Sequence, residues 1–148
     1  YRFSLGEISP DQVESLEFTM EVSSNAPMYR DDFKSDIFVS VCGNELGVWT
    51  SPGDYGGRRG RFNPSWWSDT SSQYGLLKTW RIDEYGSTLD GTALSSVKLS
   101  DLHLDQQDYI SLRIGVHADA EHVGGLNLFG EKFGDFAQGI VARIGYTK

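Results

Sequence analysis

Residues 49–67 hold most of the side chains in this chain that could recognise a ligand. The segment reads WTSPGDYGGRRGRFNPSWW and combines three tryptophans with three arginines in a stretch interrupted by glycine and proline. Glycine and proline weaken both helices and strands, so these residues predict a long loop. Flat aromatic rings beside fork-shaped guanidinium groups are a common way to hold a polar, ring-shaped or anionic ligand. We therefore expect a binding site on this loop.

The tryptophans are the first candidates for contact with a ligand. The adjacent rings of Trp66 and Trp67 could form a wall for the apolar face of a sugar, or one ring could close the end of the domain. Because neighbouring residues in extended backbone point to opposite sides, we expect one ring to be buried and the other exposed. Trp49 and Trp80 are expected to form the pocket floor, although Trp80, within a predicted strand, also fits a position in the core.

The loop arginines are the second group of candidates. We expect Arg58, Arg59 or Arg61 to supply charged donors, and Asp54 to orient an arginine or to accept a hydrogen bond from a hydroxyl. The alternative is that the arginines pair with acidic neighbours such as Asp54 and Asp36. Glycines on both sides of the arginines allow close backbone approach, as a ligand nest needs. We expect at least one arginine to be structural and another to contact ligand.

Other positions carry weaker signals. Arg113 interrupts an alternating strand, so it points either to solvent or into a polar cavity. His117, Asp119, Glu121 and His122 match no standard zinc pattern and offer too few ligands for calcium, so we expect a polar loop there and no metal or cofactor. The chain lacks a nucleophile elbow and a phosphate-binding loop, and nothing selects a pair of catalytic carboxylates. We therefore expect a non-enzyme.

Strands must position these residues, because period-two alternation of apolar and polar residues dominates the chain. The pair Gly43-Asn44 predicts the turn of a hairpin. Residues 100–107 fit either a turn of helix or a strand. Strands are predicted at residues 16–22, 37–42, 46–50, 76–83, 88–99, 109–116, 125–129 and 140–146, with 1–8 as a further candidate. About eight short strands with glycine-rich connections predict an all-β antiparallel sandwich, of jelly-roll (galactose-binding-domain-like) type, formed by residues 1–148 as one domain.

Composition restricts the partners of the chain. Its 148 residues are 39% hydrophobic and 13% aromatic, with a net charge of −8. Such an acidic domain is repelled by phosphate backbones and anionic membranes, so we expect it not to bind either by itself. No apolar stretch approaches the roughly 18 residues that span a bilayer, and no secretion signal is present. With a single cysteine, Cys42, the chain fits a cytoplasmic location.

Three long runs carry a resemblance to a known family: APMYRDDFKSDIFVSVCGNELGVWTSPGDYGGRRGRFNPSWW, QYGLLKTWRIDEYG and HVGGLNLFGEKFGDFAQGIV. They resemble the β-rich C-terminal domain of certain Firmicutes transcriptional regulators, in which an ArsR-type winged-helix DNA-binding domain comes first. The resemblance covers residues 16–146. It implies that an N-terminal part outside this chain binds DNA, and that this domain senses an effector or regulates that part by contact. The metal-sensing cysteines of ArsR proteins cannot be placed on this chain.

These observations predict the cytoplasmic effector-binding domain of a bacterial transcriptional regulator. Its ligand is expected to be a small polar molecule, with a carbohydrate as the first guess, and it would contact DNA only through the N-terminal part. Ligand binding would bias the geometry of the attached winged helices, in a protein that could form a homodimer. One alternative is a carbohydrate-binding module of a secreted glycan-degrading enzyme. The other is a dimerisation or protein-interaction domain that uses the Trp-rich loop as its interface.

Overall fold

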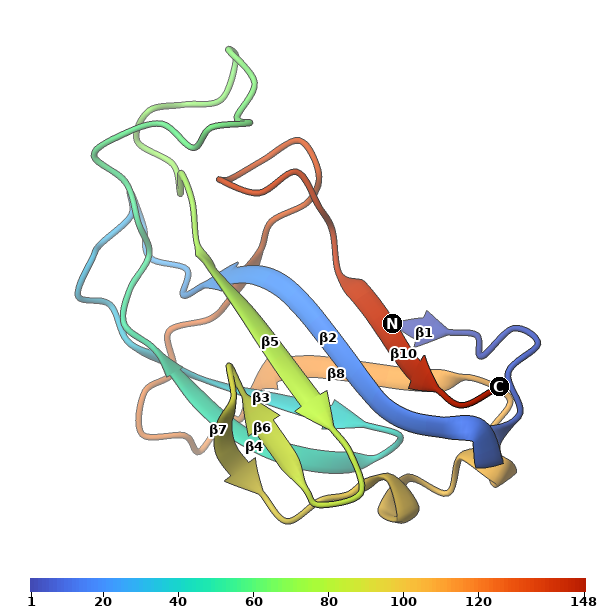
Figure 1. Ribbon diagram of the computed structural model, residues 1–148. Helices are drawn as coiled ribbons and strands as arrows, with labels where there is room; N and C mark the ends of the chain where they lie inside the picture. Colours follow the sequence, from blue (N-terminus) through green and yellow to red (C-terminus); the bar gives the residue numbers. More distant parts are fainter.

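The computed structural model describes residues 1–148 and contains two antiparallel β-sheets that pack against each other (Figure 1). One sheet has four strands in the order β1-β8-β3-β4, and the other has the order β10-β2-β5-β6-β7, with β9 paired to β2. The strands are β1 (Arg2–Phe3), β2 (Val13–Ser23), β3 (Ser35–Val41), β4 (Asn44–Ser51), β5 (Leu76–Ile82), β6 (Ser87–Leu89), β7 (Thr92–Ser95), β8 (Ile110–Val116), β9 (Asn127–Leu128) and β10 (Val141–Tyr146). The predicted all-β antiparallel sandwich is confirmed, whereas its jelly-roll order stays a prediction.

The core forms between the two sheets from alternate residues of their strands. In β2, Leu16, Phe18, Met20 and Val22 point inward and are almost fully buried, as the alternation predicts. Residues of β3, β5 and β8 pack against them, and Trp80 of β5 is the largest fully buried side chain. This burial of apolar surface is the main source of stability for the sandwich.

The sheets meet closely along one side, where β4 and β7 approach each other. A Cβ atom on Gly47 of β4 would lie 2.8 Å from Cγ of Leu94 on β7, and the φ of 142° at Gly47 also favours glycine. The glycine thus makes room for the Leu94 side chain where the two sheets approach each other.

Two hairpin turns differ from the sequence prediction. The predicted single strand at 88–99 is wrong, because Asp90 and Gly91 both have positive φ (50° and 83°) and reverse the chain between β6 and β7. Aspartate followed by glycine is typical of a type I′ turn, which requires positive φ at both positions. The other hairpin turns at Cys42 and Gly43, which have φ of 48° and 80°, one residue earlier than predicted.

The helical content consists of three short 3-10 helices, Pro10–Gln12, Leu99–Leu102 and Leu104–Gln106. The last two account for residues 100–107, and His103 separates them with a left-handed backbone conformation (φ 49°). Leu102 and Leu104 are buried, so this segment covers the core. None of the helices has the length and the apolar character needed to cross a membrane.

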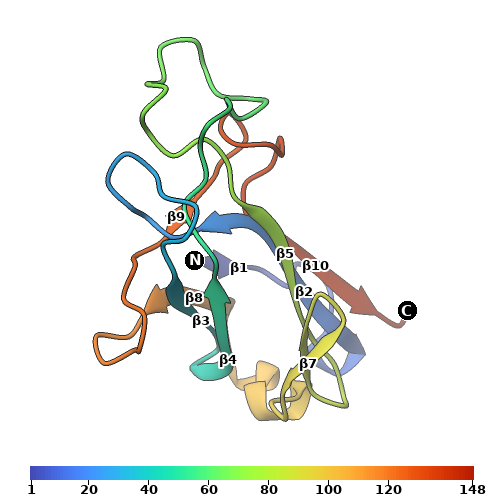
Figure 2. The same cartoon turned by 90° about the vertical axis from the view of Figure 1, so that its left-hand side faces the viewer.

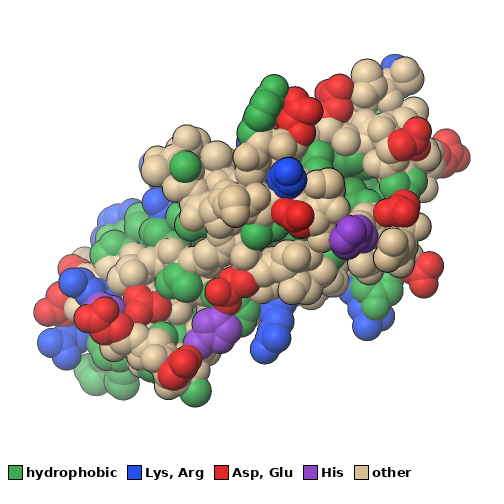
Figure 3. Space-filling view, turned by 90° about the horizontal axis from the view of Figure 1, so that it is seen from below, with side chains coloured by type: hydrophobic (Ala, Val, Ile, Leu, Met, Phe, Trp, Pro, Cys, Tyr) green, Lys and Arg blue, Asp and Glu red, His purple; other side chains and the backbone are tan.

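Long loops gather at one end of the sandwich. Residues 52–75 connect β4 to β5, and residues 129–140 connect β9 to β10; both views place these segments together above the strands (Figures 1 and 2). From the opposite end, acidic and basic side chains are dispersed among uncharged ones and form no continuous basic patch on that face (Figure 3). The loop end is therefore where the fold departs from a plain sandwich.

Candidate functional site

The Trp-rich loop is held in one conformation by its own polar side chains. Arg59 donates from Nη1 to the carbonyl of Trp67 (3.0 Å) and to Asp69 Oδ1 (2.5 Å), and from Nη2 to the carbonyl of Pro64 (2.6 Å). These bonds close the turn that presents the two adjacent tryptophans. Arg59 thus has the structural role predicted for at least one loop arginine. Its acidic partner is Asp69, and not Asp54 or Asp36 as expected.

Asn63 and Gln73 fasten the middle of the loop to its end. The Asn63 amide donates to the backbone carbonyl and to Oε1 of Gln73 (2.9 Å each), while the buried Gln73 donates to the carbonyls of Ser68 and Ser71. Gly60 lies against this pair, and a Cβ atom there would be 2.0 Å from the Gln73 carbonyl oxygen. The loop is therefore closely packed at Gly60 and Gln73, although most of its other residues are exposed.

Asp54 ties the loop to the segment that follows β2. It is fully buried, and its Oδ2 accepts hydrogen bonds from the backbone N–H of Ala26 (2.9 Å) and the hydroxyl of Ser72 (2.7 Å). Its Oδ1 has no hydrogen-bond partner, and burial raises the pKa of this carboxyl. The hydroxyl that Asp54 accepts from belongs to the protein, and Asp54 does not orient an arginine, so the role predicted for it towards a ligand stays a prediction.

Glu21 of β2 holds both loops against the six-stranded sheet. Its buried carboxylate accepts from the backbone N–H groups of Gly75 (2.8 Å), Asp135 (3.0 Å) and Phe136 (3.1 Å). Burial raises the pKa of Glu21, although these hydrogen bonds oppose the shift. Gly134 is required beside it, because a Cβ atom there would lie 2.4 Å from the carboxylate. The polar face of β2 is therefore covered by loop here, whereas alternation alone predicts a strand half open to solvent.

Arg58 joins the two loops directly. Its guanidinium makes a bidentate pair with Asp135 (2.9 and 2.6 Å) and stacks over the ring of Tyr74, 3.7 Å from the ring centre. The hydrogen bond from Arg58 lowers the pKa of Asp135. Arg61 is exposed, and only its backbone N–H contacts Asp135 (3.2 Å). Of the three loop arginines, Arg61 alone keeps its guanidinium unpaired.

Three aromatic rings cluster where the two loops meet. Trp67 and Phe133 lie edge to face with centroids 5.0 Å apart, and Trp66 packs edge to face against both, at 5.8 and 5.9 Å. Trp67 is half-buried and donates from its indole N–H to the carbonyl of Ser72 (2.9 Å), whereas Trp66 is 73% exposed. The prediction that one of the two neighbouring rings is exposed is confirmed for Trp66, whereas Trp67 is buried only in part.

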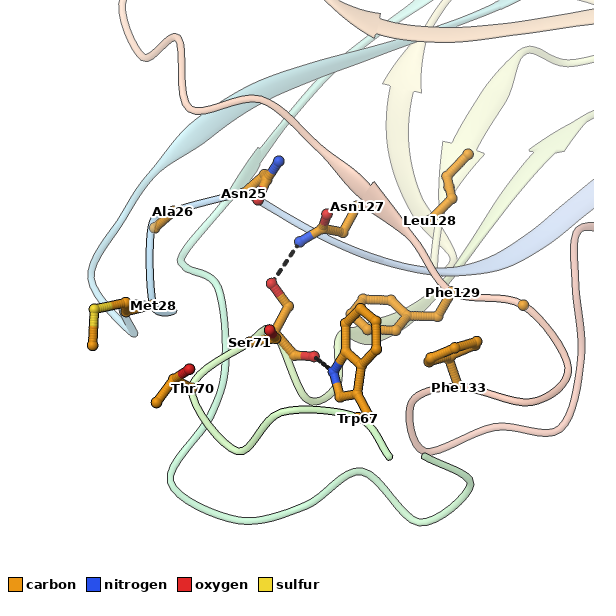
Figure 4. Close-up of a pocket in the computed structure, with 12 residues that line it drawn as sticks. Asn25, Ala26, Met28, Trp67, Thr70, Ser71, Asn127, Leu128, Phe129 and Phe133 are labelled. Atoms are coloured by element: carbon orange, nitrogen blue, oxygen red, sulfur yellow. Dashed lines mark hydrogen bonds between the residues drawn. The ribbon is translucent and has the colours of Figure 1, made fainter. Parts of the chain in front are cut away.

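A cavity of about 490 Å³ lies beside this cluster, within the range of small-molecule sites. Three segments line it: the residues that follow β2, the second half of the loop between β4 and β5, and β9 with the turn after it (Figure 4). Trp67, Phe129 and Phe133 lie together on one side, while Met28 and Thr70 lie on the other. The lining residues are Asn25, Ala26, Met28, Trp67, Thr70, Ser71, Ser72, Asn127, Leu128, Phe129, Gly130 and Phe133.

Polar groups of the lining remain available to a ligand. Asn127 donates from its amide nitrogen to Ser72 Oγ (2.9 Å) and to the carbonyl of Ser24 (3.0 Å), which fixes the side chain and leaves its Oδ1 without a protein partner. The side-chain amide of Asn25 and the hydroxyl of Ser71 also make no hydrogen bond within the protein. No charged side chain lines the cavity. It therefore offers an aromatic wall with uncharged donors and acceptors.

The rim of the cavity contains strained backbone. Met28 and Tyr29 both adopt left-handed conformations (φ 57° and 44°), and the Met28 side chain is 71% exposed. Non-glycine residues in this region cost about 1 kcal/mol or more each, and they concentrate at functional sites. Cys42, Asp90 and His103 share this conformation in turns that do not line the cavity, so the rim is one of several places where the chain turns sharply.

Several predicted site residues lie away from the cavity. Trp80 is fully buried in the core, and Trp49 of β4 packs edge to face on it at 6.5 Å, so the predicted pocket floor is not formed. Arg113 of β8 points to solvent over the ring of Phe38. His117 contacts Glu45 and stacks on Phe38.

The remaining acidic and histidine residues of that segment do not assemble a site. The backbone N–H of His122 donates to Asp36 Oδ2 (2.9 Å), and its ring nitrogen lies 3.3 Å from Asp36 Oδ1. His117 and His122 thus contact different carboxylates, and no group of three or more histidine, cysteine, aspartate or glutamate side chains is arranged to hold a metal.

The sequence prediction missed two of the polar residues that line the cavity, Asn25 and Ser71. They come from separate segments, and their types are equally typical of ordinary turns. Phe133 stands in a glycine-rich run whose only signal is an aromatic ring within a predicted turn. Of the predicted site residues, Trp67 alone lines the cavity.

Comparison of the chain with protein-family models, with curated proteins and with solved structures gives no match. The relation to ArsR-type regulators therefore stays a prediction from the sequence.

Proposed function

We propose that this domain binds an uncharged carbohydrate in the cavity beside Trp67. The observation that carries the proposal is the lining itself, an aromatic wall facing amide and hydroxyl groups with no charged side chain. The C–H face of a pyranose is apolar and suits an aromatic ring, while its hydroxyls both donate and accept hydrogen bonds. Asn25, Ser71 and Asn127 Oδ1 would take these hydroxyls.

The charge distribution narrows the ligand class. The sequence alone allows an anionic ligand held by the loop arginines, but Arg58 and Arg59 are paired with Asp135 and Asp69. The nearest carboxylate, Asp54, lies buried behind Ser72. A charged sugar derivative would thus enter a cavity without a counter-charge and lose hydration without compensation. Neutral sugars are the expected ligands.

Binding of such a ligand would have the same chemistry in either biological setting. In a transcriptional regulator, the sugar would act as the effector and would bias the attached DNA-binding part only by binding its two states with different affinity. In a carbohydrate-binding module, the same cavity would tether an enzyme to a glycan. We propose the transcriptional regulator, because the sequence resembles that family. A winged-helix domain encoded in the full gene would favour the regulator, and a hydrolase domain would favour the carbohydrate-binding module.

A thermal-shift screen against neutral sugars and sugar phosphates tests the proposal. At one hundred times the dissociation constant, a bound sugar stabilises the domain by about 2.7 kcal/mol, which raises Tm by roughly 5–11 °C in a domain of this size. We expect neutral sugars to give this shift, and both Asn25→Ala and Trp67→Ala to reduce it. Tyr85 is an exposed aromatic residue in the turn between β5 and β6 and does not line the cavity, so Tyr85→Ala is the matched control. No shift with any neutral sugar contradicts the proposal.

A further inference from the structure

Trp66 has no role in closing the cavity or the core. It is 73% exposed, and none of the cavity is lined by it. Its backbone neighbours are pinned by Arg59, which bonds the carbonyls of Pro64 and Trp67 on either side. The protein therefore fixes the position of a large apolar ring and leaves it in water. A large ring held in water next to a cavity is available to stack on a ligand.

The position of Trp66 relative to the cavity is well defined. Its ring centre lies 5.8 Å from that of Trp67 and 5.9 Å from that of Phe133. The planes of the three rings are nearly perpendicular, with interplanar angles of 73°, 79° and 76°. Trp66 thus touches the cavity wall while most of its surface, 73% exposed, is turned to solvent just outside the cavity.

We propose that the ligand is a neutral glycan of at least two pyranose rings, which occupies two adjacent subsites. The first ring enters the cavity against Trp67 and Phe133, and the second stacks on the exposed ring of Trp66. This inference rests on the proposed function, since it assigns a second subsite to the same carbohydrate site. It explains why two tryptophans stand side by side and why only one of them lines the cavity.

Calorimetric titration with matched pairs of sugars tests the second subsite. Suitable pairs are glucose with cellobiose or maltose, xylose with xylobiose, and N-acetylglucosamine with its β-1,4 dimer. A stacked aromatic contact should make the disaccharide of the recognised pair bind roughly 3- to 10-fold more tightly than the monosaccharide. In Trp66→Ala this ratio should fall to about one, while Tyr85→Ala keeps it. Trp66→Ala should leave Tm within about 2 °C of wild type, because the removed ring is exposed.

The outcomes separate the subsite from the proposed function. A sugar that binds wild type through Trp67, with a disaccharide-to-monosaccharide ratio near one, overturns the second subsite and leaves the proposed function intact. A ratio that survives Trp66→Ala also overturns it. Absence of binding by every sugar in the panel overturns both. Concentration-dependent self-association that Trp66→Ala abolishes would assign the ring to a second copy of the chain and likewise overturn the subsite.

Discussion

Replacement of Arg59 by methionine tests whether the loop arginines act on the loop or on the ligand. Arg59 makes three hydrogen bonds inside residues 59–69, whereas the side chain of Arg61, two residues on, makes none. Both side chains are exposed, and methionine keeps most of the apolar stem in each. Arg61→Met is therefore a closely matched control for Arg59→Met.

The expected loss of stability in Arg59→Met follows from these three hydrogen bonds. The pair with Asp69 is exposed, with side-chain exposures of 39% and 82%, so it contributes only about 0.5 kcal/mol. The carbonyls of Pro64 and Trp67 can bind water in the variant, so the loss of each of these two hydrogen bonds costs only about 0.5 kcal/mol of stability. The sum is about 1.5 kcal/mol, which lowers Tm by roughly 3–6 °C for a chain of this length. Arg61→Met should change Tm by less than about 2 °C.

Thermal melts followed by circular dichroism, with urea unfolding as a second measure, provide the assay. Hydrogen exchange adds a local readout, because loss of Arg59 should raise exchange in residues 59–73 and leave β2 and β5 protected. Equal Tm changes in the two variants would refute the structural role of Arg59. Retained loop protection in Arg59→Met would refute it as well.

Three further predictions concern packing and protonation. Gly60→Ala should lower the free energy of unfolding by about 2–3 kcal/mol in urea titrations, since its Cβ would displace the Gln73 carbonyl and the hydrogen bond that it accepts from Asn63. Gly139→Ala, with open space around it, should change this free energy little. Arg58 lowers the pKa of Asp135, so their pairing stabilises the fold above the unfolded-state pKa, near 3.9, and this stabilisation is lost as pH falls through the folded-state pKa. When unfolding is measured at a series of pH values, the destabilisation caused by Arg58→Met should therefore shrink below about pH 4. Burial raises the pKa of Asp54, so wild type gains stability from this group as pH falls from 7 through the raised value, and the stability of Asp54→Asn relative to wild type should decrease over the same interval.

The fold was largely predictable because alternation is a local property of the chain. The inward residues of β2 and β3 are the apolar positions of the pattern. The error at 88–99 arose at Asp90-Gly91, where a turn signal within an otherwise strand-like run determines the structure. The other face of β2 was not predictable, because Glu21 is buried by a loop that lies 114 residues further along the chain.

The site was predictable only in its location. Residues 49–67 do contribute to it, through Trp67, because rings and turn residues in one long segment indicate a structured loop. The roles of the arginines were not predictable, since Arg58 finds its partner 77 residues away in Asp135. Asn25 and Asn127 reach the cavity from separate segments that only the folded chain brings together.

An NMR titration that follows the indole N–H signals of the four tryptophans tests whether a sugar binds against Trp67 and Trp66. The four side chains occupy distinct positions: Trp67 in the cavity wall, Trp66 outside it, Trp49 at the core edge and Trp80 within the core. With a neutral disaccharide from the recognised pair, the signals of Trp67 and Trp66 should move with one dissociation constant while that of Trp80 stays fixed. A stationary Trp67 signal at saturating sugar would show that no sugar binds in the cavity.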